Sequence, residues 1–314
     1  MIKKVAVILL IAIMYFLIPI CMRFFAFGDK VLIRVQSGDS ASVTAARLKK
    51  NKLIYSEKLF LCLVRLTKTQ NKLKSGVYSF SKNDGMFKIL RSLKNGSGNL
   101  LRFTVPEGKN INQTAEIISR TINIDKEKFV KIAADRNIEG YLMPETYFVD
   151  HGISEEQLIE MMYGEFNKKI TPDMYKRAKE INVPFKDIII IASIVEKEAA
   201  KREERAMIAA VFYNRLKNNM KLQSCVTVLY AMGINKAKLN FEDIKFDSSY
   251  NTYKHLGLPP GPICSPGIES IKAVLYPADT TSMFFVSAGD GSHLFADNLC
   301  DHNKNKQAID KKRN

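Results

Sequence analysis

The chain has 314 residues, of which 46% are hydrophobic and 25% charged. This is the composition of a globular protein, and the length allows one large or two modest domains without metal or disulfide staples. The formal net charge of +16 favours a polyanionic neighbourhood such as nucleic acid, anionic lipid or an acidic polymer. The basic residues look scattered, and no zinc-finger spacing or RNA-recognition motif accompanies them, so nucleic acid is not favoured as a partner.

The amino terminus has the pattern of a membrane anchor. Lys3 and Lys4 precede an apolar run from Val5 to Met22. About 18 residues rising about 1.5 Å each span roughly 27 Å, enough for a thin bilayer core. The phenylalanines that follow the run do not suit a cleavage site, and a short amino-terminal tail usually stays inside the cell. We therefore expect residues 1–28 to form a cytoplasmic tip and an uncleaved single-pass anchor, with the body outside the cytoplasm.

Next in the chain, residues 29–98 have the pattern of a small α+β domain. Apolar periodicity and turn residues predict two strands and three helices in the order strand, helix, helix, strand, helix. The first four elements resemble a LysM-type module, which is a carbohydrate-associated fold. The expected strands are residues 31–35 and 76–80, and the expected helices are residues 42–50, 56–66 and 86–93.

We expect residues 99–314 to form a larger α+β catalytic domain. Helices are predicted for residues 112–122, 125–134, 154–169, 172–182 and 185–205, the last continuing to Leu216. From Gln223 onward the chain is rich in Gly, Pro, Asn and Tyr, which predicts loops on a rigid frame and a binding surface. A strand is expected at residues 283–287, and a frayed helix at residues 304–314.

The segment from Ile188 to Glu198 is the most informative for chemistry. It is apolar on every side and then presents Glu196, whose neighbours at helical spacing are the small residues Ala192, Ser193, Ala199 and Ala200. A partly desolvated glutamate has a raised pKa, which suits a general acid at neutral pH. Glu198 faces roughly the opposite way. The alternative is that Glu-Lys-Glu only marks the point where a core helix reaches the surface.

Two further segments could form a ligand cleft. Residues 139–147 combine a Gly/Pro bend with Tyr141 and Tyr147, which could stack on a sugar ring, although a structural turn with aromatic packing has the same pattern. Residues 250–253 lead into the Pro- and Gly-rich loops at 257–262 and 265–267, which either line a cleft or close the domain.

The five cysteines leave their pairing open. They are Cys21, Cys62, Cys225, Cys264 and Cys300. A disulfide among the last three and unpaired buried thiols are both compatible with the sequence. No metal-ligand cluster or second carboxylate stands out, whereas ordinary glycosidases use two carboxylates.

Several motifs in one order resemble the endolytic murein transglycosylases of the YceG-like family over nearly the whole chain. These motifs are Glu139–Thr146, Ala192–Glu198, Val211–Leu216, Tyr250–Tyr253, Gly257–Gly261, Ser265–Gly267 and His302–Asn303.

The resemblance implies an enzyme of the inner membrane whose body faces the periplasm, and which cuts the MurNAc–GlcNAc β-1,4 bond of nascent strands, limiting their length. The C6 hydroxyl of the substrate would attack C1 and leave a 1,6-anhydro-MurNAc end, with Glu196 acting first as acid and then as base. The expected partners are peptidoglycan strands, the membrane and peptidoglycan synthases (penicillin-binding proteins), without nucleic acid, cofactor or metal. The expected substrate-binding residues are Ser193, Gln223, Thr227, Asn251, Tyr253, Tyr141 and Glu145.

One motif departs from the family. Where the family has Gln-Thr-Asp-Pro-Thr-Val, this chain has Gln223-Ser-Cys-Val-Thr-Val228, so Cys225 and Val226 replace an aspartate and a proline. An acid at that position therefore plays no part here. The alternative function is a non-catalytic peptidoglycan-binding or scaffold protein of the cell-wall synthesis machinery, which would be free to lose Glu196. Stem-peptide preference and oligomeric state have no signature in the sequence.

Overall fold

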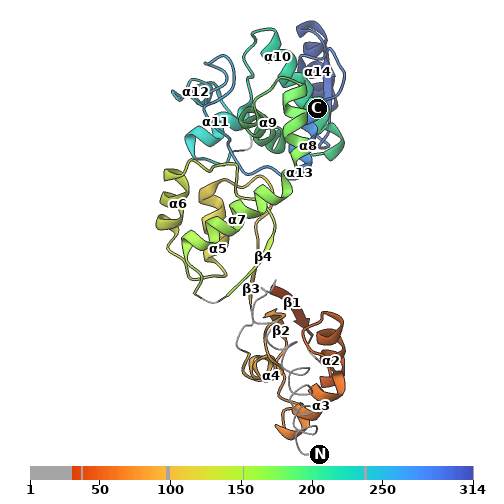
Figure 1. Cartoon of the computed structure of the whole chain (residues 1–314). Coiled ribbons are helices and arrows are strands. Elements are labelled where there is room, and N and C mark those ends of the chain that lie inside the picture. Colours follow the sequence, from red (N-terminus) through yellow and green to blue (C-terminus); the bar gives the residue numbers. More distant parts are fainter. Residues whose placement is uncertain (1–29, 37, 97–99, 151, 237–238, 314) are drawn as a thin grey trace, which may run out of the picture. The chain divides into compact units, whose positions relative to one another are not determined.

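The computed structural model describes residues 30–36, 38–96, 100–150, 152–236 and 239–313. Within them the chain forms two compact units (Figure 1). The first comprises residues 30–102 and 148–150, and the second comprises residues 103–147 and 152–313. The chain passes between the units in β3 (Leu101–Thr104) and β4 (Thr146–Val149), which pair with each other.

The first unit has the predicted element order. Its elements are β1 (Lys30–Val35), α2 (Ala41–Lys50), α3 (Glu57–Leu66), β2 (Gly76–Ser81) and α4 (Met86–Asn95). The strands are antiparallel, with Lys30 opposite Ser81 and Val35 opposite Gly76. Alternate residues of both strands enter the core, as the period of two requires. The strand–helix–helix–strand order is thus confirmed, and kinship with LysM-type modules stays a prediction.

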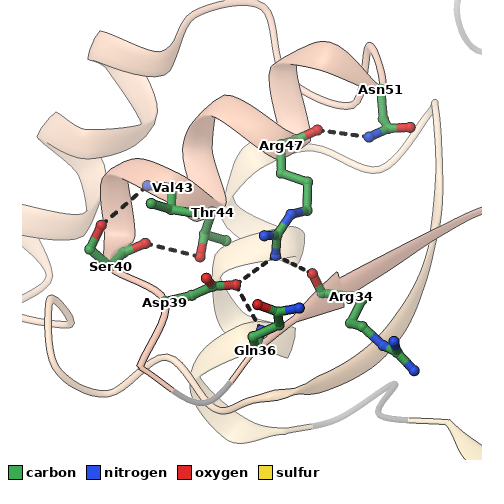
Figure 2. Close-up of polar contacts among 8 residues, drawn as sticks. All are labelled: Arg34, Gln36, Asp39, Ser40, Val43, Thr44, Arg47 and Asn51. Atoms are coloured by element: carbon green, nitrogen blue, oxygen red, sulfur yellow. Dashed lines mark hydrogen bonds and ion pairs between the residues drawn. The ribbon is translucent and has the colours of Figure 1, made fainter.

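A network of polar contacts fixes the turn between β1 and α2 (Figure 2). The Asp39 carboxylate accepts hydrogen bonds from the Gln36 backbone N–H at 2.7 Å and from Arg47 Nη1 at 2.6 Å. These bonds, the backbone one foremost, hold the pKa of Asp39 below its ordinary value. Arg47 also donates to the carbonyl of Arg34, and Ser40 caps α2 by accepting from the Val43 N–H. The carboxylate of Asp39 is therefore already committed to an internal cation.

The second unit is mostly helical. After β3, its elements are α5 (Ile111–Ser119), α6 (Lys126–Asp135), β4, α7 (Glu155–Lys169), α8 (Pro172–Glu180), α9 (Phe185–Glu198), the 3₁₀ turn η1 (Arg202–Glu204), α10 (Arg205–Lys217), α11 (Cys225–Met232), α12 (Phe241–Ile244), α13 (Ile268–Leu275), β5 (Phe284–Ser287), β6 (His293–Ala296) and α14 (Leu299–Arg313). β5 and β6 form an antiparallel hairpin on which α14 packs. The region after Gln223 is therefore more regular than predicted, because three short helices and a second strand interrupt its loops.

Helix α9 is the centre of this unit. Every residue from Ile188 to Val195 is buried, which confirms the prediction from its all-round apolar sequence. It packs against α8, α10, α11 and α13, which gather around it in Figure 1. The predicted continuous helix through residues 199–205 is wrong, because Ala199 is extended with φ −80° and ψ 106°. Tertiary contacts override the high helix propensity of alanine here, and the chain restarts as α10 at Arg205.

The predicted membrane anchor, residues 1–28, lies outside the described residues. In the part of the chain that is described, no helix combines the length and apolar character needed to cross a bilayer.

A partly buried carboxylate, that of Glu139, joins α5 and α11 to its own loop in the second unit. It accepts hydrogen bonds from the backbone N–H groups of Ile111, at the start of α5, and of Gly140, and from the hydroxyl of Tyr230 in α11. Burial nevertheless raises its pKa from the ordinary 4.5 to about 7, because three neutral donors do not replace full hydration of the anion.

This pKa predicts that stability falls between pH 4.5 and 7. In that window the folded chain holds a proton that the unfolded chain has lost, so raising the pH removes up to about 3 kcal/mol of unfolding free energy, and the loss persists above pH 7. In Glu139→Gln the drop should be smaller by this amount in denaturant titrations at pH 5 and 7.5. Glu145→Gln, at an exposed carboxylate, should keep it. A full drop in Glu139→Gln would show that another group is responsible.

Candidate active site

Glu196 lies in the last turn of α9 and is held by three donors. Its Oε2 accepts hydrogen bonds from the Ser270 hydroxyl at 2.6 Å and from the Gly267 backbone N–H at 3.1 Å, while Arg205 Nη2 donates to Oε1 at 3.3 Å. Gly267 is the N-cap of α13 and Ser270 lies in its first turn, so the positive end of that helix faces the carboxylate. The side chain is only 7% exposed. The small neighbours of Glu196 along the helix predicted a carboxylate open to solvent. This prediction is wrong, because Arg205 covers the carboxylate.

A second carboxylate, Glu107, lies beside the first. Its Oε2 is 3.6 Å from the same Arg205 nitrogen that contacts Glu196. Burial, and next the negative charge of Glu196, raise the pKa of Glu107, while Arg205 and Arg202 oppose the rise. With a side chain 40% exposed, Glu107 can meet a ligand directly. No local pattern distinguishes Glu107 from a surface residue, because it only follows Val-Pro at the start of the second region.

Close approach at Gly267 makes this geometry possible. A Cβ atom there would lie 1.9 Å from Glu107 Oε1, far inside contact distance, so any side chain at this position would push the Glu107 carboxylate out of its place. The two loops are tied together by backbone bonds, from the Gly108 N–H to the Ser265 carbonyl at 3.0 Å and from the Ser265 N–H to the Lys109 carbonyl at 2.9 Å. The stiff loop predicted at residues 265–267 therefore positions both carboxylates.

Arg205 links the two acids. Its side chain is 8% exposed, and within the described residues its Nε and Nη1 atoms are buried without a hydrogen-bond partner. A desolvated guanidinium acts strongly on nearby anions, since little water screens it. Arg205 therefore holds Glu196 and Glu107 close to each other.

Glu198 belongs to a different polar cluster, as predicted from its opposite direction on the helix. Its Oε1 accepts a hydrogen bond from the Ser224 hydroxyl at 2.5 Å, and burial raises its pKa. The Ser224 backbone N–H in turn donates to Thr252 Oγ1, which lies 2.9 Å from Thr227 Oγ1. These contacts join the loop before α11 to the loop at residues 250–253.

Three of the predicted substrate-binding residues, Gln223, Asn251 and Tyr253, lie in these two loops, and a fourth, Thr227, lies in the first turn of α11. Thr227 and Asn251 are fully buried, and Asn251 donates to the carbonyls of Ile244 and Phe246 while accepting from the Tyr253 N–H. Their polar groups therefore shape the loops from inside. Tyr253 is partly exposed and contacts the thiol of Cys225 at 3.0 Å. Gln223 is exposed, and its backbone has a φ of +50°, which is uncommon for a residue other than glycine.

The other three predicted binding residues have partners away from Glu196. Ser193 is fully buried, and its hydroxyl donates to the Ile190 carbonyl and accepts from the Ile263 N–H, so its polar group binds the backbone, and a sugar contact of this residue stays a prediction. Tyr141 packs edge-on against Phe166. Glu145 is exposed and pairs with Lys169 at 3.2 Å.

The described cysteines form no disulfide. Cys62, Cys225, Cys264 and Cys300 are free thiols, so the alternative of unpaired buried thiols holds for Cys264, while the other three are unpaired but exposed. Cys225, which replaces the aspartate of the family motif, is the first residue of α11.

This arrangement of side chains is typical of an enzyme that uses acid/base catalysis. A carboxylate at the end of a buried helix, a second carboxylate and an arginine between them are the groups with which enzymes that break glycosidic bonds move protons and stabilise developing charge.

Comparison with known proteins agrees. Residues 33–308 match the YceG-like family. The chain is 34% identical to the endolytic murein transglycosylase of Bacillus subtilis, over 88% of this chain and 84% of that protein. It is 29% identical to that of Streptococcus pneumoniae, over 88% of this chain and 57% of that protein. A crystal structure of a yceG-like protein of Listeria monocytogenes has a TM-score of 0.61 and 30% identity, over 88% of this chain and 98% of that chain. The chain therefore belongs to the YceG-like family.

The geometry predicts unequal roles for the glutamates. Glu196→Gln keeps size and hydrogen bonding but removes the transferable proton, so turnover of murein, the polymer in the relatives' names, should fall about a hundredfold or more. Glu107→Gln, which removes only a neighbouring charge, should cost about tenfold. Release of soluble glycan from purified murein measures both.

Glu198→Gln is the matched control, since it lies in the same helical turn but in the other cluster. It should reduce turnover less than Glu196→Gln. If Glu198→Gln abolished turnover while Glu196→Gln kept it, with unchanged melting of both variants, the assignment of the acid would be wrong.

Proposed function

We propose that the chain is a peptidoglycan lytic transglycosylase that cuts the MurNAc–GlcNAc β-1,4 bond within glycan strands and leaves 1,6-anhydro-MurNAc ends. The observation that carries the proposal is Glu196, held by Arg205, Ser270 and the start of α13 in a chain of the YceG-like family. The names of the relatives supply the substrate class and the reaction type.

The proposed reaction needs one proton-transfer group. Protonated Glu196 gives its proton to the glycosidic oxygen as the C1–O4 bond breaks, and the GlcNAc side leaves as an alcohol. The C6 hydroxyl of MurNAc then attacks C1, and its proton returns to Glu196, so the enzyme is regenerated without water. Ser270 and the Gly267 N–H bind Oε2 and so hold the carboxyl in one orientation.

Glu107 and Arg205 are proposed to serve the transition state. Cleavage develops positive charge on C1 and the ring oxygen, and a fixed carboxylate near that charge lowers the barrier. Glu107 is exposed enough to provide this charge, and Arg205 keeps it close to Glu196. A scaffold protein, the second candidate, has no need for a buried arginine between two acids.

The product should distinguish this reaction from hydrolysis. Mass spectrometry of an early murein digest should find 1,6-anhydro-MurNAc ends, lighter by one water than hydrolytic ends, on fragments of several disaccharides. Reducing MurNAc ends would identify a muramidase. Release of single disaccharides alone would identify an exo-acting enzyme.

We also propose an inner-membrane location with the body in the periplasm, where the enzyme would limit strand length beside peptidoglycan synthases. The support is the apolar run after Lys3 and Lys4. A carboxy-terminal phosphatase fusion that works only outside the cytoplasm should be active, and a cytoplasm-only reporter should be silent. The reverse pattern would refute both the orientation and access to murein.

A further inference from the structure

The positive charge of this protein is concentrated in its first unit. Residues 30–102 carry 16 Lys and Arg against three Asp and Glu, whereas residues 103–314 carry 29 against 28. The interpretation of the basic residues as scattered is therefore wrong. Because a lysine-rich proteome would enrich both units alike, the asymmetry points to a local anionic partner.

Ion pairs within the first unit do not neutralise this excess of positive charge. Each of the three acids already faces a cation: Asp39 pairs with Arg47 (Figure 2), Glu57 with Lys49 and Asp84 with Lys88. The only other acid of the unit is Asp150, at the end of β4. At least 12 positive charges of the unit therefore have no carboxylate of their own unit to neutralise them.

Apolar and basic side chains share one surface of α4. Phe87, Arg91 and Lys94 follow helical spacing, and together with Thr67 and Thr69 they line one shallow depression. Lys94 also lines an adjoining depression with Lys72 and Lys74. We call this surface the α4 face, made of Phe87, Arg91, Lys94, Lys72 and Lys74. Phe87 is 74% exposed, which is unusual for a phenylalanine.

More exposed apolar groups lie in the same unit. On α3, Leu59 is 60% and Leu66 77% exposed, and Tyr55 just before it is 66% exposed. Large apolar side chains beside lysines and arginines are the composition of surfaces that rest on a bilayer, where the rings enter the headgroup layer and the cations meet lipid phosphates. Binding of a soluble polyanion would require the positive charges but not the exposed apolar side chains.

The position in the chain also places this unit close to a membrane. Lys30, where β1 begins, follows the apolar run ending at Met22 by eight residues. An extended chain of eight residues reaches at most about 29 Å, so a bilayer holding that run would keep β1 within this distance.

We propose that the α4 face binds the anionic phospholipid surface of the membrane, with Phe87 inserted among the headgroups and Arg91, Lys94, Lys72 and Lys74 on the phosphates. The first unit then lies on the surface of the bilayer, so that the proposed anchor is not its only attachment to the membrane. This inference does not depend on the reaction proposed for the second unit.

The protein contains no tryptophan, so Phe87→Trp introduces a single fluorescent reporter. The full-length variant is reconstituted into phosphatidylcholine vesicles with or without phosphatidylglycerol. We expect the emission to shift to shorter wavelength, and brominated acyl chains to quench it, only when phosphatidylglycerol is present. High salt should reverse the shift, because it screens the charges. Adding Arg91→Glu and Lys94→Glu should abolish it.

Phe241→Trp is the matched control, since Phe241 is 84% exposed but lies in the second unit, and its emission should not depend on the lipid. Leu66→Trp provides a second reporter if Phe87→Trp melts early. Equal emission of the Phe87→Trp reporter in both vesicle types would overturn the proposal. So would an equal shift caused by soluble long-chain polyphosphate with phosphatidylcholine vesicles, which would identify a soluble polyanion as the ligand.

Discussion

The contact between Arg205 and Glu196 is the constraint on which the second unit depends. For the two to meet, α9 must stop after Glu198 and the chain must turn back over residues 199–204 before α10 begins. The arginine then lies in a buried position where two of its nitrogens lack a hydrogen-bond partner among the described residues, which costs free energy that the packing of α9 must offset. Such a group persists where surrounding structure fixes it, and such places are often functional.

The spacing of apolar residues was sufficient to predict the features that are determined within a single helix, namely which residues are buried and which way the side chains face. A segment apolar on all sides can only be buried, and two glutamates two residues apart must face different ways, so α9, Glu196 and the separate cluster at Glu198 were predictable. The same holds for the strands and helices of the first unit. Their ends were marked by Ser40 and Ser56, which cap α2 and α3.

What depends on contacts between distant segments was not predictable. Glu107, Arg205 and Ser270 reach Glu196 from three places in the chain, and nothing in the local sequence distinguishes them from surface residues. Arg205 in particular ends a charged stretch, Lys-Arg-Glu-Glu-Arg, which has the pattern of a solvated face. Conversely, Ser193, Thr227 and Asn251 were predicted to bind substrate, and in the structure their polar groups bind the backbone inside the unit. A single sequence cannot tell a hydroxyl that meets a ligand from one that holds a loop.

The missing side chain at Gly267 has a consequence for reading other sequences. Glu107 occupies the space that a β-carbon at position 267 would fill, so the two positions are sterically coupled although 160 residues apart in the chain. A related sequence with any other residue at the position of Gly267 must place its second carboxylate differently or do without it. One glycine therefore provides a sequence marker for the two-acid arrangement, which the glutamate of Val-Pro-Glu-Gly alone does not.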